Sequence, residues 1–294
     1  MQIGFIGVGN MGGPMVRNLL NAGDAVMVFD VASKAVAAIV VDGAVAVESP
    51  AAAVEGAEMV ITMLPAGTQV REVYCGDGGV IAAAAPGTVL IDCSTIDVES
   101  AREIAAAADA AGLSMLDAPV SGGVAGASVA ALTFMVGGAA EAFTKAEPVL
   151  AKMGRTIVHA GPSGNGQVAK ICNNMILGIS MIALCEAFTL AKSLGLEAQT
   201  LFDISSNASG SCWAMLNHLP VAGIVETAAS NRNFVPGFAT DMMLKDLRLA
   251  QQAANASGTA TSLGAEAAAL YGIFSAAGNG GLDYSAIIKM IAGK

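Results

Sequence analysis

The sequence predicts two domains: a doubly wound α/β domain with a mostly parallel sheet, followed by an all-α domain. Short apolar runs alternate with helical stretches over the first half of the chain, and this alternation is typical of a parallel sheet with crossover helices. No strand pattern follows Ala160, whereas helical patterns continue to the end. We therefore place the α/β domain at residues 1–162 and the helical domain at residues 163–294.

Seven strands are predicted, of which Met59–Met63 and Thr88–Asp92 are near-continuously apolar, as expected for strands that are buried on both faces. In chain order the seven strands are Gln2–Ile6, Ala25–Asp30, Met59–Met63, Thr88–Asp92, Leu113–Asp117, Leu132–Val136 and Thr156–His159. A glycine-rich turn follows the first of them, and a helical run then continues to about Asn21.

A cluster of turn residues, Gly161-Pro162-Ser163-Gly164-Asn165-Gly166, separates the two halves. The predicted helices beyond it are Gln167–Leu194, Ala198–Ser206, Ala239–Ala256, Thr261–Ala276 and a last one after Leu282. Because the first of these helices leaves the boundary directly, we expect a rigid junction between the domains.

Composition excludes several classes of protein. Of 294 residues, 54% are hydrophobic and only 13% are charged, which excludes intrinsic disorder. A net charge of −10 argues against a nucleic-acid partner. The longest apolar run, 175–191, contains Glu186, so no uninterrupted run of the roughly 18–20 residues needed to span a membrane is found.

Cysteine usage and the N-terminus predict a cytoplasmic protein. The five cysteines form no CxxC pair and no secretory signal is evident, so we expect reduced, mostly buried thiols. The large apolar content, above all in the helical half, favours subunit contacts in a homodimer or homotetramer.

The first strand is followed by a G-x-G-x-x-G element, Gly7-Val8-Gly9-Asn10-Met11-Gly12, which opens the first helix. Glycines there permit a tight turn, close approach of the backbone to a pyrophosphate, and close packing of helix on strand. The helix N-terminus adds free N–H groups for the anion. In this strand–turn–helix context the element predicts a Rossmann dinucleotide site.

Asp30 ends the second strand, 18 residues after Gly12. A carboxylate at this position accepts hydrogen bonds from ribose hydroxyls and repels a 2′-phosphate. NAD is therefore favoured over NADP, although Lys34 lies nearby. FAD also suits the fingerprint, but nothing else in the sequence indicates a flavin. The structural alternative for Asp30 is a cap at the strand end.

The candidate acid–base residue is Lys170, which shares a helix face with Asn174 four residues later. A cation and an amide amid apolar residues are costly to bury without purpose. The alternative is a surface lysine near a helix start. His159 ends a predicted strand, which favours a structural role, and His218 lies in a loop-like stretch. No cluster has metal-ligand spacing, so we expect no metal.

Four blocks in order now resemble the β-hydroxyacid dehydrogenase family: Phe5–Gly12, then Asp117-Ala118-Pro119-Val120-Ser121-Gly122-Gly123, then Gly164–Asn174, and then Lys245-Asp246-Leu247. The resemblance extends nearly from end to end. The segments Ser209–Trp213 and Asn233–Phe238 resemble the branch of the family that acts on hydroxyisobutyrate.

The resemblance implies a role for each matching residue. It makes Lys170 the catalytic acid–base and Asn174 the residue that orients the substrate oxygen. It assigns the substrate carboxylate to Ser121, Gly122 and Gly123. It assigns NAD to Gly7, Gly9, Asn10, Met11, Gly12, Asp30, Leu64, Pro65, Val70, Thr95 and Lys245.

Three further assignments have structural alternatives, and so has that of Trp213 to the substrate. Pro65 is alternatively a turn residue, Val70 a core residue and Thr95 a helix N-cap. Trp213, the only tryptophan, packs either against the substrate's methyl group or in the core or a subunit interface.

The implied reaction is NAD-dependent oxidation of a small β-hydroxyacid, foremost 3-hydroxyisobutyrate to methylmalonate semialdehyde. Hydride leaves the carbinol carbon while Lys170 takes the hydroxyl proton, so the site must lower the pKa of this amine toward neutrality. Serine or tartronate-semialdehyde chemistry stays open, because the region 216–230 is loop-like and its relation to substrate is undefined. A non-catalytic NAD-sensing protein is the remote alternative.

Overall fold

The computed structural model describes residues 1–293 and divides into two compact units, Met1–Lys170 and the residues from Ile171 onward. The division falls inside one continuous helix, α9 (Asn165–Ser193), and so lies later than the change of sequence pattern at residue 162. Each unit is described by itself below.

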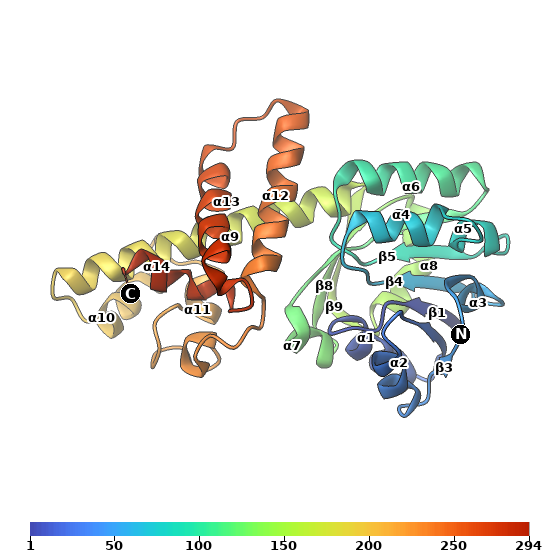
Figure 1. Ribbon diagram of the computed structural model, residues 1–294, viewed down its shortest axis with the longest axis horizontal. Helices are drawn as coiled ribbons and strands as arrows, with labels where there is room; N and C mark the ends of the chain where they lie inside the picture. Colours follow the sequence, from blue (N-terminus) through green and yellow to red (C-terminus); the bar gives the residue numbers. More distant parts are fainter. Residues whose placement is uncertain (294) are drawn as a thin grey trace. The chain divides into compact units, whose positions relative to one another are not determined.

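The first unit is a nine-stranded sheet with helices on both faces (Figure 1). Its elements are β1 (Gln2–Ile6), α1 (Gly12–Asn21), β2 (Ala25–Phe29), α2 (Ser33–Val40), β3 (Val45–Ala46), α3 (Pro50–Val54), β4 (Met59–Thr62), α4 (Gly67–Cys75), α5 (Val80–Ala83), β5 (Val89–Asp92), α6 (Val98–Ala110), β6 (Ser114–Asp117), β7 (Val120–Ser121), α7 (Gly123–Ser128), β8 (Leu132–Gly137), α8 (Ala140–Leu150) and β9 (Gly154–Gly161).

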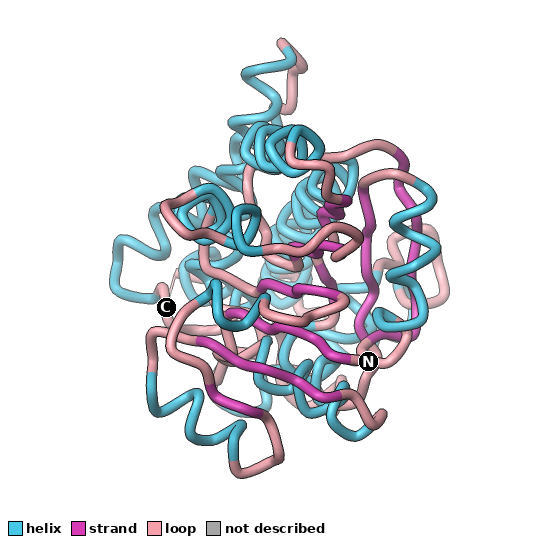
Figure 2. Tube along the Cα trace, turned by 90° about the vertical axis from the view of Figure 1, so that its right-hand side faces the viewer, coloured by secondary structure: helices cyan, strands magenta, loops and turns pink. Residues whose placement is uncertain are grey.

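Strand order in the sheet is β3-β2-β1-β4-β5-β6-β8-β7, with β9 paired to β8. The strands are drawn in magenta in Figure 2. The pairs from β3 to β6 are all parallel, whereas β8 runs antiparallel to β6 and β7. The order reverses between β1 and β4, which is where doubly wound sheets bind ligands at their carboxyl ends. The predicted mostly parallel, doubly wound sheet is therefore confirmed.

Two hydrophobic clusters cover the two faces of the sheet. Strand β1 supplies both, because Phe5 packs with α1 residues such as Met15 on one face while Ile6 packs with Val70 and Tyr74 of α4 on the other. Strands β4 and β5 are buried at every position. This two-sided burial explains their near-continuous apolar sequence.

Two short strands, β3 and β7, were not predicted. Each has two residues, which is too short to show an apolar pattern. Strand β9 was predicted at 156–159 but begins at Gly154 and ends at Gly161, because irregular pairing with β8 extends it at both ends.

The second unit is helical, as predicted. After α9 it contains α10 (Ala198–Ser205), α11 (Trp213–His218), η1 (Ala229–Arg232), α12 (Thr240–Ser257), α13 (Ser262–Phe274), η2 (Ser275–Asn279), η3 (Tyr284–Ile287) and α14 (Ile288–Ile291). Its core joins Met181 and Cys185 of α9 to Met243 and Leu247 of α12, and to Tyr271 of α13.

Helix α11 corrects the sequence interpretation of this region. His218 was predicted to lie in a loop-like stretch, but it ends a short helix that begins at Trp213. The flanking Gly, Ser and Pro residues concealed it. Residues beyond it are largely irregular until α12, apart from the single turn η1.

Helix α9 is, among the described residues, the one helix long and apolar enough to cross a membrane by length and composition alone. It has 29 residues and a mean hydropathy of 1.7 in its most apolar window, 39% of which is buried. Core helices of proteins without membrane spans meet the same criterion. Met181 and Cys185 of α9 pack into the helical core, while most of that apolar window is not buried within the described chain.

The cysteines differ from the expectation of mostly buried thiols. All five are free, and Cys93 and Cys185 are buried, but Cys75 and Cys172 are exposed and Cys212 is half-buried. Both exposed thiols lie on outward-facing positions of helices, α4 and α9.

Candidate active site

The glycine-rich turn between β1 and α1 contains two kinds of glycine. At two positions a side chain would collide with the protein backbone, and at a third it would not. A Cβ at Gly7 would lie 2.3 Å from the Met63 carbonyl oxygen, and one at Gly12 would lie 1.9 Å from that of Gly7. A Cβ at Gly9 would meet nothing within 4 Å, and Gly9 is exposed. Internal packing thus explains two glycines and leaves Gly9 for a close external approach, as a pyrophosphate requires. The turn fits a dinucleotide.

Asp30 follows β2 and holds this turn in place. Its Oδ2 accepts a hydrogen bond from the Val8 N–H at 2.8 Å, and its Oδ1 accepts one from the Ala32 N–H at 2.8 Å. Asp30 therefore caps the end of β2, which was the structural alternative for this residue. This capping does not exclude the ribose role, because each carboxylate oxygen can accept a further hydrogen bond.

The other residues assigned to NAD lie at the carboxyl ends of the strands or just beyond. Asn10 is exposed, and Met11 precedes α1 without a side-chain cap. Leu64, ahead of Pro65, donates its N–H to Ser94 Oγ at 2.8 Å. The side chain of Val70 is fully buried in the core cluster with Tyr74. Val70 is therefore a core residue, which was the structural alternative for it.

Thr95 lies in the loop between β5 and α6, and the alternative that it caps α6 is wrong. Helix α6 is capped by Asp97, which accepts a hydrogen bond from the Ser100 N–H at 2.7 Å. Thr95 is half-buried, two residues earlier in the same loop.

The segment predicted to bind the substrate carboxylate follows β6. Ser121 ends β7, opposite Thr133 of β8. Gly122 has φ of 132°, a conformation that favours glycine, and Gly123 begins α7. The chain therefore turns sharply here, with little side-chain cover over its backbone.

Asp117, the last residue of β6, fastens the start of α9 to the sheet. Its Oδ1 accepts from the Gly164 N–H at 2.7 Å and its Oδ2 from the Gln167 N–H at 2.9 Å. A Cβ at Gly166 would come within 2.5 Å of the Asp117 carbonyl oxygen. The turn cluster thus allows α9 to begin directly against β6. Burial raises the pKa of Asp117 to about 6, against the opposing effect of these hydrogen bonds.

Lys170 and Asn174 lie on α9 with exposed fractions of 6% and 2%. The alternative of a surface lysine is therefore wrong. Asn174 accepts from Asn173 Nδ2 at 2.9 Å through Oδ1, and its Nδ2 donates to Asp246 Oδ2 at 2.5 Å.

Lys245 and Asp246 of α12 continue this polar group in the helical unit. Lys245 Nζ lies 3.6 Å from Asp246 Oδ1. Asp246 is buried, so it is a charged partner that ties Asn174 on α9 to Lys245 on α12. Sequence reasoning placed Asp246 near Lys245 but did not foresee its bond to Asn174, which depends on the packing of two helices.

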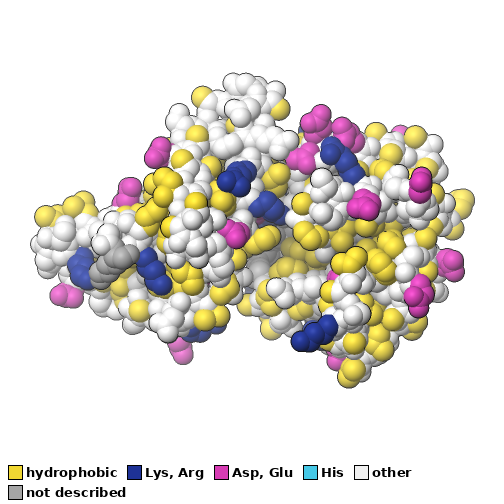
Figure 3. Space-filling view, viewed as in Figure 1, with side chains coloured by type: hydrophobic (Ala, Val, Ile, Leu, Met, Phe, Trp, Pro, Cys, Tyr) yellow, Lys and Arg dark blue, Asp and Glu magenta, His cyan; other side chains and the backbone are white. Residues whose placement is uncertain are grey.

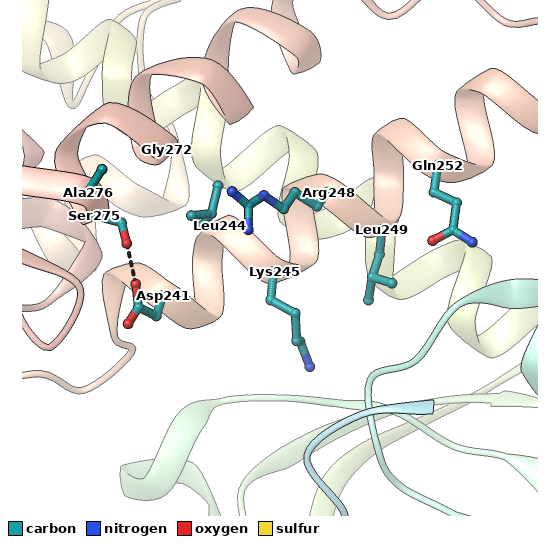
Figure 4. Close-up of a pocket in the computed structure, with 9 residues that line it drawn as sticks. All are labelled: Asp241, Leu244, Lys245, Arg248, Leu249, Gln252, Gly272, Ser275 and Ala276. Atoms are coloured by element: carbon teal, nitrogen blue, oxygen red, sulfur yellow. Dashed lines mark hydrogen bonds between the residues drawn. The ribbon is translucent and has the colours of Figure 1, made fainter. Parts of the chain in front are cut away.

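An open pocket of about 390 Å³ in the helical unit is lined by Lys245 and by Arg248, one turn later on α12 (Figure 4). Asp241 lies at its other end, where it accepts a hydrogen bond from Ser275 Oγ at 2.6 Å. Arg248 was not singled out from the sequence, because a lone arginine on a helix carries no motif.

The three aromatic or histidine candidates differ in their surroundings. Trp213 is 57% exposed, with its ring 4.9 Å from that of His218, so Trp213 is not a core residue. Burial lowers the pKa of His218, whose ring also packs 5.6 Å from Tyr284. His159 Nε2 hydrogen-bonds the Gly138 carbonyl at 2.8 Å and its ring stacks on Phe143, a structural role as expected.

The two kinds of glycine in the first turn predict opposite phenotypes. Gly12→Ala should destabilise the chain by about 1–3 kcal/mol or more, because its Cβ collides with backbone. Gly9→Ala should keep the wild-type melting temperature and weaken NAD binding at least about tenfold, because its Cβ blocks only a ligand. Thermal melts and NAD titrations of both variants decide this; wild-type NAD affinity in Gly9→Ala would contradict it.

The raised pKa of Asp117 predicts that the free energy of unfolding falls as pH rises. Its pKa is raised in the folded chain, so between about pH 4 and 6 the folded state binds more protons than the unfolded state, and the free energy of unfolding falls as pH rises. Asp117→Asn removes this titration. The wild type should therefore lose up to about 3 kcal/mol relative to the variant between pH 4 and 7. Urea unfolding across this range measures it, and parallel pH curves would overturn it.

Two family models match nearly the whole chain. Residues 2–161 match the NAD binding domain of 6-phosphogluconate dehydrogenase, and residues 164–291 match the NAD-binding region of NADP-dependent 3-hydroxyisobutyrate dehydrogenase. These two matches meet at the turn cluster ahead of α9.

Full-length relatives share about half of their residues with the chain. An NAD-dependent L-serine dehydrogenase of Pseudomonas aeruginosa is 49% identical, covering 98% of this chain and 97% of the relative. A 3-hydroxyisobutyrate dehydrogenase of the same organism is also 49% identical, covering 100% and 99%. A solved structure of 3-hydroxyisobutyrate dehydrogenase from Mycobacterium tuberculosis with L-serine is 48% identical, with a TM-score of 0.95 over 99% and 98% of the two chains. The chain thus belongs to the β-hydroxyacid dehydrogenase family and is an NAD-dependent oxidoreductase.

Proposed function

We propose that the chain oxidises a small β-hydroxyacid with NAD, foremost 3-hydroxyisobutyrate to methylmalonate semialdehyde, with Lys170 as general acid–base. The observation that carries this proposal is the burial of Lys170 and Asn174 one turn apart on α9. Lysine and asparagine are rarely buried without a task, because desolvation of a charge or amide is costly.

The residues divide the reaction between them. Bound NAD supplies the acceptor for the hydride that leaves the carbinol carbon. Lys170 takes the hydroxyl proton, and in the reverse direction returns it to the carbonyl oxygen. Beyond the bonds to Asp246 and Asn173, the described residues leave one N–H and one lone pair of the Asn174 amide available, which suit it to hold the substrate oxygen.

The substrate carboxylate is assigned to the turn after β7. Ser121 offers a hydroxyl, and the backbone of Gly122 and Gly123 is accessible to a small anion because neither residue carries a side chain. Gly122 has a positive φ, at which residues with a side chain would be strained. A substitution there would block the approach of the substrate carboxylate to the backbone and would also strain the turn.

Hydroxyisobutyrate is placed ahead of L-serine on an electrostatic argument. Serine carries an ammonium group where hydroxyisobutyrate carries a methyl, so its site should hold an available carboxylate. The acidic side chain next to Lys245, Asp246, already faces an ammonium group, because Lys245 Nζ lies 3.6 Å from its Oδ1. This ion pair, rather than a lack of acceptor capacity, favours the methyl group.

L-serine is the second candidate. A relative 49% identical is named for L-serine oxidation, and a structure 48% identical was determined with L-serine. Tartronate-semialdehyde chemistry is a weaker alternative, since no relative named above carries it.

Location and assembly complete the proposal. We place the enzyme in the cytoplasm as a homodimer or homotetramer. Apolar atoms are widely exposed between sparse charges (Figure 3), and in the helical unit they include Ile176 and Leu190 of α9, each at least 60% exposed. Faces of this kind are typical of subunit contacts.

Lys170→Ala should lower kcat about 10²- to 10⁴-fold, as expected for loss of a general acid–base, while the dissociation constant for NAD changes less than about threefold. Lys192→Ala is the matched control, because Lys192 is an exposed lysine on the same helix. Steady-state kinetics and NAD titration measure both effects. Near-wild-type turnover in Lys170→Ala would exclude the proposed role.

The substrate order is a separate prediction. With NAD, kcat/KM for 3-hydroxyisobutyrate should exceed that for L-serine by about tenfold or more, and 3-hydroxypropionate, which lacks the methyl group, should also fall below it. Initial rates with these acids and glycerate, each with NAD and NADP, measure the order. A higher kcat/KM for L-serine would make serine oxidation the function.

A further inference from the structure

Gln167 is completely buried in the first turn of α9, three residues before Lys170. The sequence motifs imply no role for this residue. Its side chain makes two hydrogen bonds to backbone groups of the loop between β5 and α6. Oε1 accepts from the Ile96 N–H at 3.1 Å, and Nε2 donates to the Ser94 carbonyl at 2.8 Å.

These two backbone groups flank Thr95. Strand β5 ends at Asp92 and α6 begins at Val98, so the loop between them has no strand partner of its own. The carboxamide of Gln167 supplies one donor and one acceptor to it, as a neighbouring strand would. A buried backbone group is costly to leave unpaired, so the loop around Thr95 depends on this side chain for its conformation.

The same loop is fastened from its other side. Ser94 Oγ donates to Asp92 Oδ1 at 2.6 Å and accepts from the Leu64 N–H at 2.8 Å. The chain after β4, the chain after β5 and the first turn of α9 are therefore joined through Ser94 and Gln167. All of these residues belong to the first unit.

The backbone of Gln167 is held as firmly as its side chain. Its N–H donates to Asp117 at the end of β6, so the residue cannot shift along the sheet without breaking three hydrogen bonds. A helix is rigid over one turn. The position of Lys170 relative to Thr95 thus follows from the position of Gln167.

We propose that Gln167 is a positioning residue, which holds the loop carrying Thr95 and the turn carrying Lys170 in one fixed geometry through its carboxamide. The proposal rests on the proposed function in one respect, namely that Lys170 moves the proton. A displacement of about 1 Å at a reacting group lowers rates by about 100-fold, so loss of this link should act on kcat.

Two substitutions of Gln167 separate positioning from folding. Gln167→Leu removes both hydrogen bonds at similar volume. Gln167→Glu keeps the shape and the acceptor for Ile96, and donates to the Ser94 carbonyl only while its carboxyl is protonated. Gln251→Leu is the control: Gln251 is a half-buried glutamine on α12 that accepts from Thr261 Oγ1 at 3.2 Å, remote in sequence from Thr95 and Lys170.

In Gln167→Leu, kcat should fall about 10- to 100-fold, with KM and the NAD dissociation constant within about threefold of wild type. In Gln167→Glu, the ratio of its kcat to that of the wild type should rise as pH falls, because protonation restores the donor. Gln251→Leu should retain wild-type kcat. Wild-type kcat in folded Gln167→Leu, or a Gln167→Glu ratio independent of pH, would overturn the proposal.

Hydrogen exchange of the Ile96 amide, without NAD or substrate, distinguishes this inference from the proposed function. The exchange should be faster in Gln167→Leu than in wild type and unchanged in Lys170→Ala. If the wild type oxidises no β-hydroxyacid, the proposed function fails, while faster Ile96 exchange still supports the link. Unchanged exchange in Gln167→Leu refutes the link whatever the enzyme oxidises.

Discussion

The attachment of α9 to the ends of the central strands is the constraint on which the candidate site depends. A buried carboxylate, Asp117, accepts two N–H groups from the first turn of the helix and its preceding loop. Water is largely excluded there, so each of these bonds is strong and each would be costly to lose. The helix that carries Lys170 thus begins at a position set by β6. The raised pKa of Asp117 is the cost of burying its charge for this purpose.

The glycine-rich turn follows a different logic, because residues required by the fold and a residue open to a ligand lie side by side in it. Gly12 lets α1 pack on β1, Gly7 lets the turn approach the Met63 carbonyl after β4, and Asp30 fastens the turn to the end of β2. Gly9 alone has no internal reason to be glycine. A turn shaped by internal contacts and left open at one position is pre-organised, so little ordering remains to oppose ligand binding.

Local sequence patterns predicted much of the fold and part of the candidate site. The apolar runs predicted every longer strand, and the G-x-G-x-x-G element with Asp30 predicted the nucleotide turn, because both depend on residues close in sequence. They did not reveal β7, which is too short for a pattern, or α11, whose flanking glycines and serines resemble a loop. The supporting roles of Asp246 and Gln167 could not be predicted either, although Asp246 lies in a block that carries the family resemblance. Each acts through hydrogen bonds to residues some 70 positions away, Asp246 to Asn174 and Gln167 to Ser94 and Ile96.

These distant bonds explain why the family resemblance and the geometry contribute different information. The resemblance assigns roles to Lys170 and Asn174, but it says nothing of what fixes each one. Asn174 is bonded to Asp246 of α12, while Lys170 follows directly on the turn held by Gln167 and Asp117. Two residues one turn apart on the same helix are thus held by two separate groups of hydrogen bonds. A substitution at either set can change the reaction without touching the reacting residues, so specificity and rate in this family need not follow the motif residues alone.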